Sequence, residues 1–137
     1  MEETTRRTIS VDDFETIKLL GKGEYGKVVL VRKIDSGELF ALKILKKRLI
    51  QDKNQIDHTK SERSILERVS HPYIVHLRYA FQTKLKLYFV LEYCPCGELY
   101  NHLSKDRRFP EARAKFYAAC IVLALNYLHE NNIIYRE

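Results

Sequence analysis

The sequence predicts an α+β fold, with five β-strands and one helix in its first part and further helices in its second part. Three observations support this prediction. Short runs rich in β-branched and aromatic residues, separated by turn residues, occupy most of residues 14–93. A strand-turn-strand stretch among them carries three closely spaced glycines. From residue 98 onward, apolar residues recur at helical spacing.

The three glycines, Gly21, Gly23 and Gly26, have the spacing G-x-G-x-x-G. A glycine backbone can approach a ligand closely and can adopt positive φ without steric cost. A Rossmann fingerprint would need a helix directly after the glycines, but residues 27–32 are rich in β-branched side chains. A Walker loop would end in Gly-Lys-Ser/Thr, and here valine follows Gly26-Lys27. The pattern therefore predicts a hairpin whose tip folds over phosphates, with an ordinary glycine-containing hairpin as the alternative.

Turn residues and apolar periodicity delimit the other elements. Asp35-Ser36-Gly37 is a turn signal between the second and third strands. The almost continuous apolar run Leu87–Leu91 is typical of a central strand. The predicted strands are 14–21, 27–32, 39–45, 77–83 and 86–93, and the predicted helices are 50–69, 98–105 and 111–130.

Polar residues and prolines predict where the helices begin and end. Asp57 is the predicted N-cap of the first long helix, and His71-Pro72 stops that helix. Pro110 suits position N1 of the last helix, and Asn131-Asn132 can supply its left-handed C-cap. The last helix is apolar on nearly all sides, which is typical of a helix covered on several sides. Little sequence follows it, so we expect this helix to expose apolar surface and the sequence to be cut short.

Two charged residues fall on otherwise apolar faces. Strand alternation places Lys43 on one face with Leu39, Ala41 and Leu45. Helical spacing places Glu62 on a stripe with Ile65 and Val69. Because a buried charge needs a partner, we expect these two side chains to form a pair. The alternative is that both are surface residues at the edges of their stripes.

The composition favours a globular protein of the cytoplasm, or alternatively of the nucleus. Hydrophobic residues make up 45% of the 137 residues, which suffices for a core. The net charge of +6 comes from scattered basic residues apart from Lys46-Lys47-Arg48. That cluster is expected to be a solvated helix face, with a patch for acidic partners as the alternative. Nothing in the sequence resembles a basic stripe for nucleic acid, a membrane span or a signal peptide.

The three cysteines, Cys94, Cys96 and Cys120, do not have zinc-site spacing. We therefore expect free thiols in a reducing compartment and no structural metal.

From Phe14 to its end, the chain resembles the N-terminal half of a eukaryotic protein kinase domain, most closely the AGC group of serine/threonine kinases. The motifs at family spacing are Gly21–Val28, Ala41-Leu42-Lys43, Glu62, Leu91-Glu92-Tyr93, Gly97-Glu98-Leu99 and Tyr135-Arg136. Residues 55–59 and 116–119 favour the AGC group, as does the tyrosine before Arg136. The resemblance implies a flexible segment 1–13 and a partial kinase domain 14–137. Within that domain, 14–93 would be an N-lobe with a five-stranded antiparallel sheet and helix C, and 94–137 the hinge and the start of the C-lobe.

The resemblance also implies a role for individual residues in binding ATP and Mg²⁺. Lys43 would contact the α- and β-phosphates and be held by Glu62. Val28 and Ala41 would enclose adenine, and Leu91 would be the gatekeeper. The other implied nucleotide contacts are Leu20, Gly21, Lys22, Gly23, Glu24, Tyr25 and Gly26 in the loop, the backbones of Glu92 and Cys94, and Glu98 at the ribose. His58 resembles the helix-C histidine that meets an activation-loop phosphate.

The chain departs from the family pattern at its end. Glu137 stands where the family has its catalytic aspartate, and the longer side chain would disturb general-base geometry. The family's two magnesium ligands and its activation loop are absent from this sequence. The chain as written is therefore expected to lack kinase activity. Cys96 replaces a usual glycine near the edge of the pocket.

Three functional classes stay open from the sequence. The first is a kinase that transfers the γ-phosphate of ATP to protein Ser/Thr, recorded here in truncated form. It would have a protein substrate, an activating kinase and a docking tail as partners. The second is a short protein that binds nucleotide without catalysis. The third is a scaffold that offers its surfaces to other proteins.

Overall fold

The computed structural model describes residues 8–135. The chain forms two compact units. The first contains the described residues up to Lys60 together with Leu77–Tyr93, and the second contains Ser61–His76 together with the residues from Cys94 onward. Among the helices of residues 8–135, none is both long enough and apolar enough to cross a membrane.

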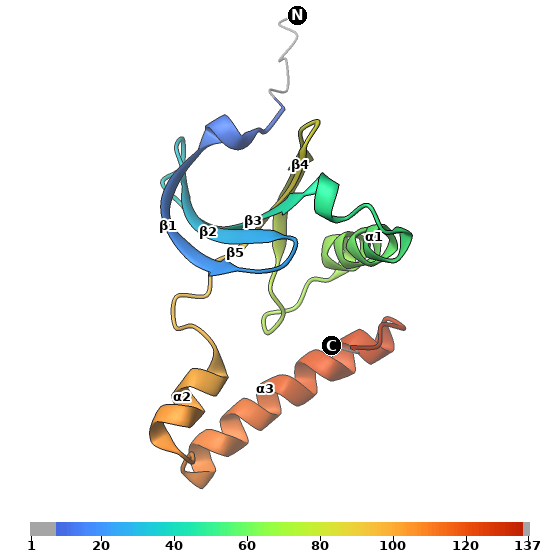
Figure 1. Ribbon diagram of the computed structural model, residues 1–137. Coiled ribbons are helices and arrows are strands. Elements are labelled where there is room, and N and C mark those ends of the chain that lie inside the picture. Colours follow the sequence, from blue (N-terminus) through green and yellow to red (C-terminus); the bar gives the residue numbers. More distant parts are fainter. Residues whose placement is uncertain (1–7, 136–137) are drawn as a thin grey trace, which may run out of the picture. The chain divides into compact units, whose positions relative to one another are not determined.

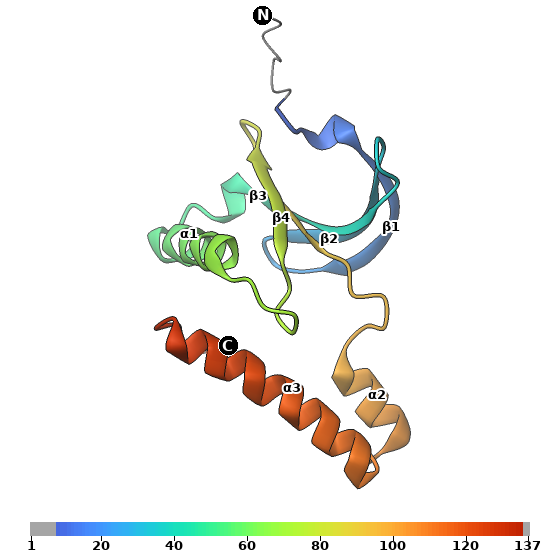
Figure 2. The ribbon, with the colours of Figure 1, turned by 180° about the vertical axis from the view of Figure 1, so that it is seen from behind.

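The first unit is built on a single curved, antiparallel sheet (Figure 1). Its strands are β1 (Phe14–Lys22), β2 (Gly26–Lys33), β3 (Leu39–Lys46), β4 (Leu77–Gln82) and β5 (Lys86–Glu92). Their order is β1-β2-β3-β5-β4, so β1 and β4 are the edges, as the view from behind also shows (Figure 2). All five strands agree with the predicted ranges within about two residues, and β5 is central as its apolar run predicts.

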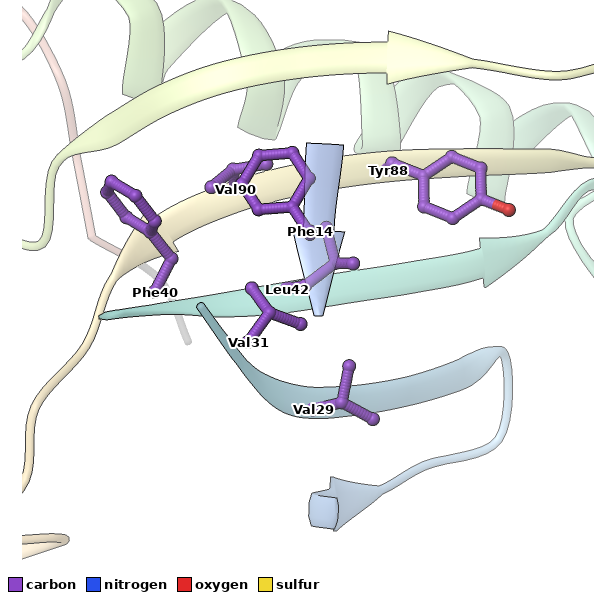
Figure 3. Close-up of a cluster of buried hydrophobic side chains, with 7 residues drawn as sticks. All are labelled: Phe14, Val29, Val31, Phe40, Leu42, Tyr88 and Val90. Atoms are coloured by element: carbon purple, nitrogen blue, oxygen red, sulfur yellow. The ribbon is translucent and has the colours of Figure 1, made fainter. Parts of the chain in front are cut away.

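One face of this sheet carries the main hydrophobic core (Figure 3). The register pairs Val31 with Phe40, and Leu42 with both Val29 and Val90, so these side chains share a face. The seven buried members of the cluster are Phe14, Val29, Val31, Phe40, Leu42, Tyr88 and Val90. Aromatic side chains also pack between strands. The ring of Phe81 on β4 stacks on the ring of Tyr88 on β5, with 4.8 Å between the ring centroids.

Two short 3-10 helices flank the first three strands. Helix η1 (Val11–Asp13) precedes β1, and the backbone N–H of Ser10 donates to the Asp13 carboxylate at 2.8 Å. This helix falls within the segment 1–13 that is predicted to be flexible, of which residues 1–7 lie outside the described residues. Helix η2 (Lys47–Leu49) directly follows β3.

The first long helix, α1, spans Lys53–Arg68 and crosses the boundary between the two units. It begins at Lys53, within the predicted range 50–69, and the prediction of Asp57 as its N-cap is wrong because Asp57 lies inside the helix. The Asp52 carboxylate accepts the backbone N–H of Asn54 at 3.1 Å, which is the hydrogen bond of an N-cap. The helix ends before His71-Pro72, as predicted.

The second unit contains helices α2 (Leu99–Asp106) and α3 (Glu111–Glu130). Pro110 occupies the N-cap position of α3, one residue before the predicted N1. Arg113 on α3 donates to the Asp106 carboxylate at 2.6 Å, and its guanidinium lies 4.4 Å from the centroid of the Phe109 ring. These contacts join the end of α2 to the start of α3.

The C-terminal end of α3 has the predicted left-handed cap. Asn132 has a φ of 58°, and the backbone N–H of Ile133 donates to the carbonyl of Leu128 at 2.8 Å. The N–H of Asn132 donates to the carbonyl of His129, which completes a Schellman motif. As expected, α3 exposes apolar side chains, and Phe116 and Val122 are each 62% exposed.

Candidate functional site

The glycine-rich segment forms the turn between β1 and β2, as the spacing of its glycines predicts. The backbone N–H of Gly23 donates to the carbonyl of Gly26 at 2.8 Å, which closes the turn. Space for a Cβ is open at Gly21 and Gly23. Neither of these two glycines has positive φ, and the positive-φ glycines of the described chain are Gly37 and Gly97. The open backbone at the turn, rather than an unusual φ, is what makes it accessible to a ligand.

The turn is held close to the end of β3. The backbone N–H of Lys46 donates to the carbonyl of Tyr25 at 3.0 Å, and the Tyr25 side chain is half-buried. Gly26 is pressed against β3, where a Cβ would stand 1.8 Å from the carbonyl oxygen of Ile44. Only glycine fits at this position without a backbone shift.

The antiparallel register gathers the predicted nucleotide-binding residues on one face of the sheet. Val28 pairs with Lys43, and Lys43 pairs in turn with Phe89 on β5. Ala41 pairs with Leu91. Because directly opposed residues share a face, Val28, Ala41, Lys43 and Leu91 all lie on the face opposite the main core. This agrees with the predicted alternation on β3.

This face combines a cation with an apolar floor. Lys43 and Ala41 are half-buried, whereas Phe89 beside Lys43 is only 3% exposed. Phe89 is not among the predicted site residues, because only the register of β3 against β5 shows that it lies opposite the lysine. A cation set among apolar side chains next to an exposed glycine turn suits a ligand with a flat apolar part and a phosphate chain. The residues present therefore fit ATP.

The loop contributes the remaining predicted contacts of the first unit. Leu20, Lys22 and Glu24 are exposed, and Leu20 lies at an irregularity in the β1–β2 register between Leu19 and Gly21. Glu92 is exposed at the end of β5.

Other predicted site residues belong to the second unit. Glu62 is half-buried on α1, within the least exposed stripe of that helix, which also contains Ile65 and Leu66. Since Lys43 belongs to the first unit, the pairing of Lys43 with Glu62 stays a prediction. Cys94 and Glu98 are exposed between β5 and α2, and their predicted roles also stay predictions.

Magnesium has no candidate site among residues 8–135, where no group of three or more His, Cys, Asp and Glu side chains could hold a metal ion. Glu137, predicted at the catalytic-aspartate position, lies outside the described residues.

Comparison with known proteins identifies the family. Residues 14–137 match the family described as "Protein kinase domain". The chain is 51% identical over 129 residues to a RAC family serine/threonine-protein kinase homolog of Dictyostelium discoideum, covering 94% of this chain and 29% of that protein. It is 48% identical over 132 residues to the human RAC-beta serine/threonine-protein kinase, covering 96% of this chain and 27% of that protein. The chain thus spans less than a third of the length of these relatives.

Proposed function

This chain belongs to the protein kinase domain family, and from this membership we propose that it forms the nucleotide-binding part of a serine/threonine kinase of the AGC group. The proposed reaction transfers the γ-phosphate of ATP to a serine or threonine hydroxyl of a protein substrate. One observation carries the proposal. The strand register places Val28, Ala41, Lys43 and Leu91 on one sheet face beside an open glycine turn.

Each residue of this face would make a different contact with ATP. Val28 and Ala41 offer small apolar side chains against the flat adenine ring. The backbone N–H groups of the glycine turn would donate to phosphate oxygens. Lys43 would place its charge at the α- and β-phosphates, where it orients the nucleotide for transfer. The residues named here bind and position ATP, and the rest of the reaction needs groups outside this face.

Further partners follow from the same proposal. His58 is exposed on α1, so it is accessible to a phosphorylated residue supplied by an activation segment. A protein substrate, an upstream kinase and a docking tail are the proposed macromolecular partners. We also propose a cytoplasmic or nuclear location, supported by the free cysteines Cys96 and Cys120.

The substitution Lys43→Met tests the proposal, with Lys46→Met as the matched control. Both lysines lie on β3, but Lys46 is exposed and belongs to the opposite face. ATP affinity is measured by titration calorimetry, and transfer is measured as labelled phosphate entering a degenerate Ser/Thr peptide library. In the complete kinase to which this chain would belong, we expect Lys43→Met to lower transfer by about a hundredfold or more, and Lys46→Met to leave it nearly unchanged.

Two results would contradict this proposal in different ways. Equal, detectable transfer by the Lys43→Met variant and the unaltered complete kinase would refute the role of the lysine. ATP binding by the complete protein without any transfer would favour a non-catalytic nucleotide-binding protein, which is the second candidate function.

A further inference from the structure

Five basic residues gather at one end of the first unit, and we call this group the basic tip: Lys46, Lys47, Arg48, Lys84 and Lys86. The register places Lys46 directly opposite Lys86, at the end of β3 and the start of β5. The backbone N–H of Lys47 donates to the carbonyl of Leu85 at 3.0 Å, so η2 lies against the β4–β5 turn. Two segments far apart in the sequence therefore bring their cations together.

The charges of the basic tip are not balanced by neighbouring acids. Residues 39–51 and 77–91, which contain the whole basic tip, include no aspartate or glutamate. Within residues 8–135, none of its five members takes part in an ion pair. Lys47 instead donates to the side-chain amide oxygen of Gln82 at 2.8 Å.

This arrangement opposes the stability of the sheet. Like charges directly opposite each other on neighbouring strands are destabilising, and Lys46 and Lys86 form such a pair. An anionic partner would relieve the repulsion.

Exposed leucines accompany the cations. Leu85 lies between Lys84 and Lys86 in the β4–β5 turn and is 71% exposed. Leu49, next to Arg48 in η2, is 41% exposed. An acidic peptide could be bound by the lysines alone and would gain little from a leucine at the tip of a turn. A membrane surface attracts cations to its anionic headgroups and also accepts an apolar side chain between them.

We propose that the basic tip docks on an anionic lipid membrane, with Leu85 entering the headgroup region and the surrounding lysines and arginine contacting the phosphates. This is peripheral binding of a sheet end, and it is independent of nucleotide binding by the opposite face of β3. The five cations would attract the basic tip to anionic lipid, and the protruding leucine would add a hydrophobic contact in the headgroup region.

The test measures partitioning of the full chain onto vesicles by co-sedimentation. One vesicle type is pure phosphatidylcholine, and the other adds phosphatidylserine. We expect binding only to the anionic vesicles and weaker binding as salt is raised. The pair Lys84→Gln with Lys86→Gln removes two cations and should lower the partition coefficient about thirtyfold. Leu85→Ala should lower it about tenfold.

The pair Lys105→Gln with Arg108→Gln is the matched control, because it removes the same charge from exposed positions of the second unit. Its partitioning should stay close to that of the unaltered chain. Thermal melting of each variant verifies folding, and the salt dependence of the unaltered chain provides a readout without any substitution.

Three results would overturn the proposal. The first is equal binding to neutral and anionic vesicles. The second is the same loss of binding in the control pair as in the tip pair. The third is a pair of results: the Leu85→Ala variant partitions like the unaltered chain, and polyglutamate displaces the chain from the vesicles. Together these results would identify an acidic peptide as the partner instead.

Discussion

Gly26 and Ile44 approach so closely across β2 and β3 that a Cβ on the glycine would stand 1.8 Å from the isoleucine carbonyl oxygen and 2.9 Å from its carbonyl carbon. Both obstructing atoms belong to the backbone of a central strand, so a side-chain rotation cannot remove the clash. The last glycine of the turn is therefore required by the packing of the hairpin, independently of any ligand.

The first prediction is that Gly26→Ala lowers the free energy of unfolding by about 1–3 kcal/mol, because the added methyl group forces β2 away from β3. Chemical denaturation monitored by circular dichroism measures this loss. Gly21→Ala is the control, since space at Gly21 is open, and its effect should stay within about 0.5 kcal/mol. Equal stability of both variants would contradict the close approach at Gly26.

The second prediction concerns the core face of the sheet. Leu42 is 1% exposed within the main cluster, and Leu42→Ala should lower the free energy of unfolding by about 2–5 kcal/mol by leaving a cavity. Leu39 lies on the same strand at 39% exposure, so Leu39→Ala should have a much smaller effect. Urea titration of the two variants compares them, and a larger effect at Leu39 would contradict the described faces of β3.

The third prediction concerns the turn between β2 and β3, where Lys33 Nζ donates to both carboxylate oxygens of Asp35. This hydrogen bond and the lysine charge hold the pKa of Asp35 below its usual range and raise the pKa of Lys33. A carboxyl with a lowered folded-state pKa stabilises the protein above its unfolded pKa, and this stabilisation is lost as the pH falls through the folded pKa.

An NMR titration of the Asp35 carboxyl carbon should therefore give a midpoint below that of an ordinary aspartate. In the Lys33→Met variant the midpoint should rise toward the ordinary value, because the hydrogen-bond donor is gone. The global stability should change little, since the carboxylate is exposed. A midpoint that is the same with and without Lys33 would refute the pairing.

The fourth prediction concerns the end of α3. Asn132 has left-handed backbone conformation, which asparagine and glycine adopt more easily than other residues. Asn132→Ala should destabilise this end by about 1 kcal/mol, whereas Asn132→Gly should be neutral or stabilising. Hydrogen exchange of the Ile133 amide, which donates to Leu128, gives a local readout. Faster exchange in the glycine variant than in the alanine variant would be the opposite of what we expect.

Local patterns predicted most of the fold. The turn Asp35-Ser36-Gly37, the apolar run of β5 and the Asn131-Asn132 cap are each determined by a few neighbouring residues, and the structure agrees with all three. The glycine spacing likewise predicted the turn between β1 and β2. Period-two alternation correctly placed Ala41 and Lys43 on one face.

The rest depended on information that local patterns do not contain. Asp52 and Asp57 are both acids at a plausible helix start, and only the hydrogen bond to Asn54 identifies the actual cap. The position of Phe89 opposite Lys43 follows only from the register between two strands that are distant in the sequence. The close packing at Gly26 is a property of two strands, so the glycine spacing suggested a ligand and did not reveal the steric requirement.

The strand order has a consequence for how the first unit folds. Strands β1, β2 and β3 pair with their neighbours in sequence, so their hairpins can form early and independently. In contrast, β3 pairs with β5, and the whole of η2, α1 and β4 lies between them in the chain. Closing that long loop has an entropic cost that must be met before the central ladder forms. We expect the β3–β5 pairing to form late, so the sheet face that carries Ala41, Lys43 and Leu91 should be the last part of the sheet to assemble.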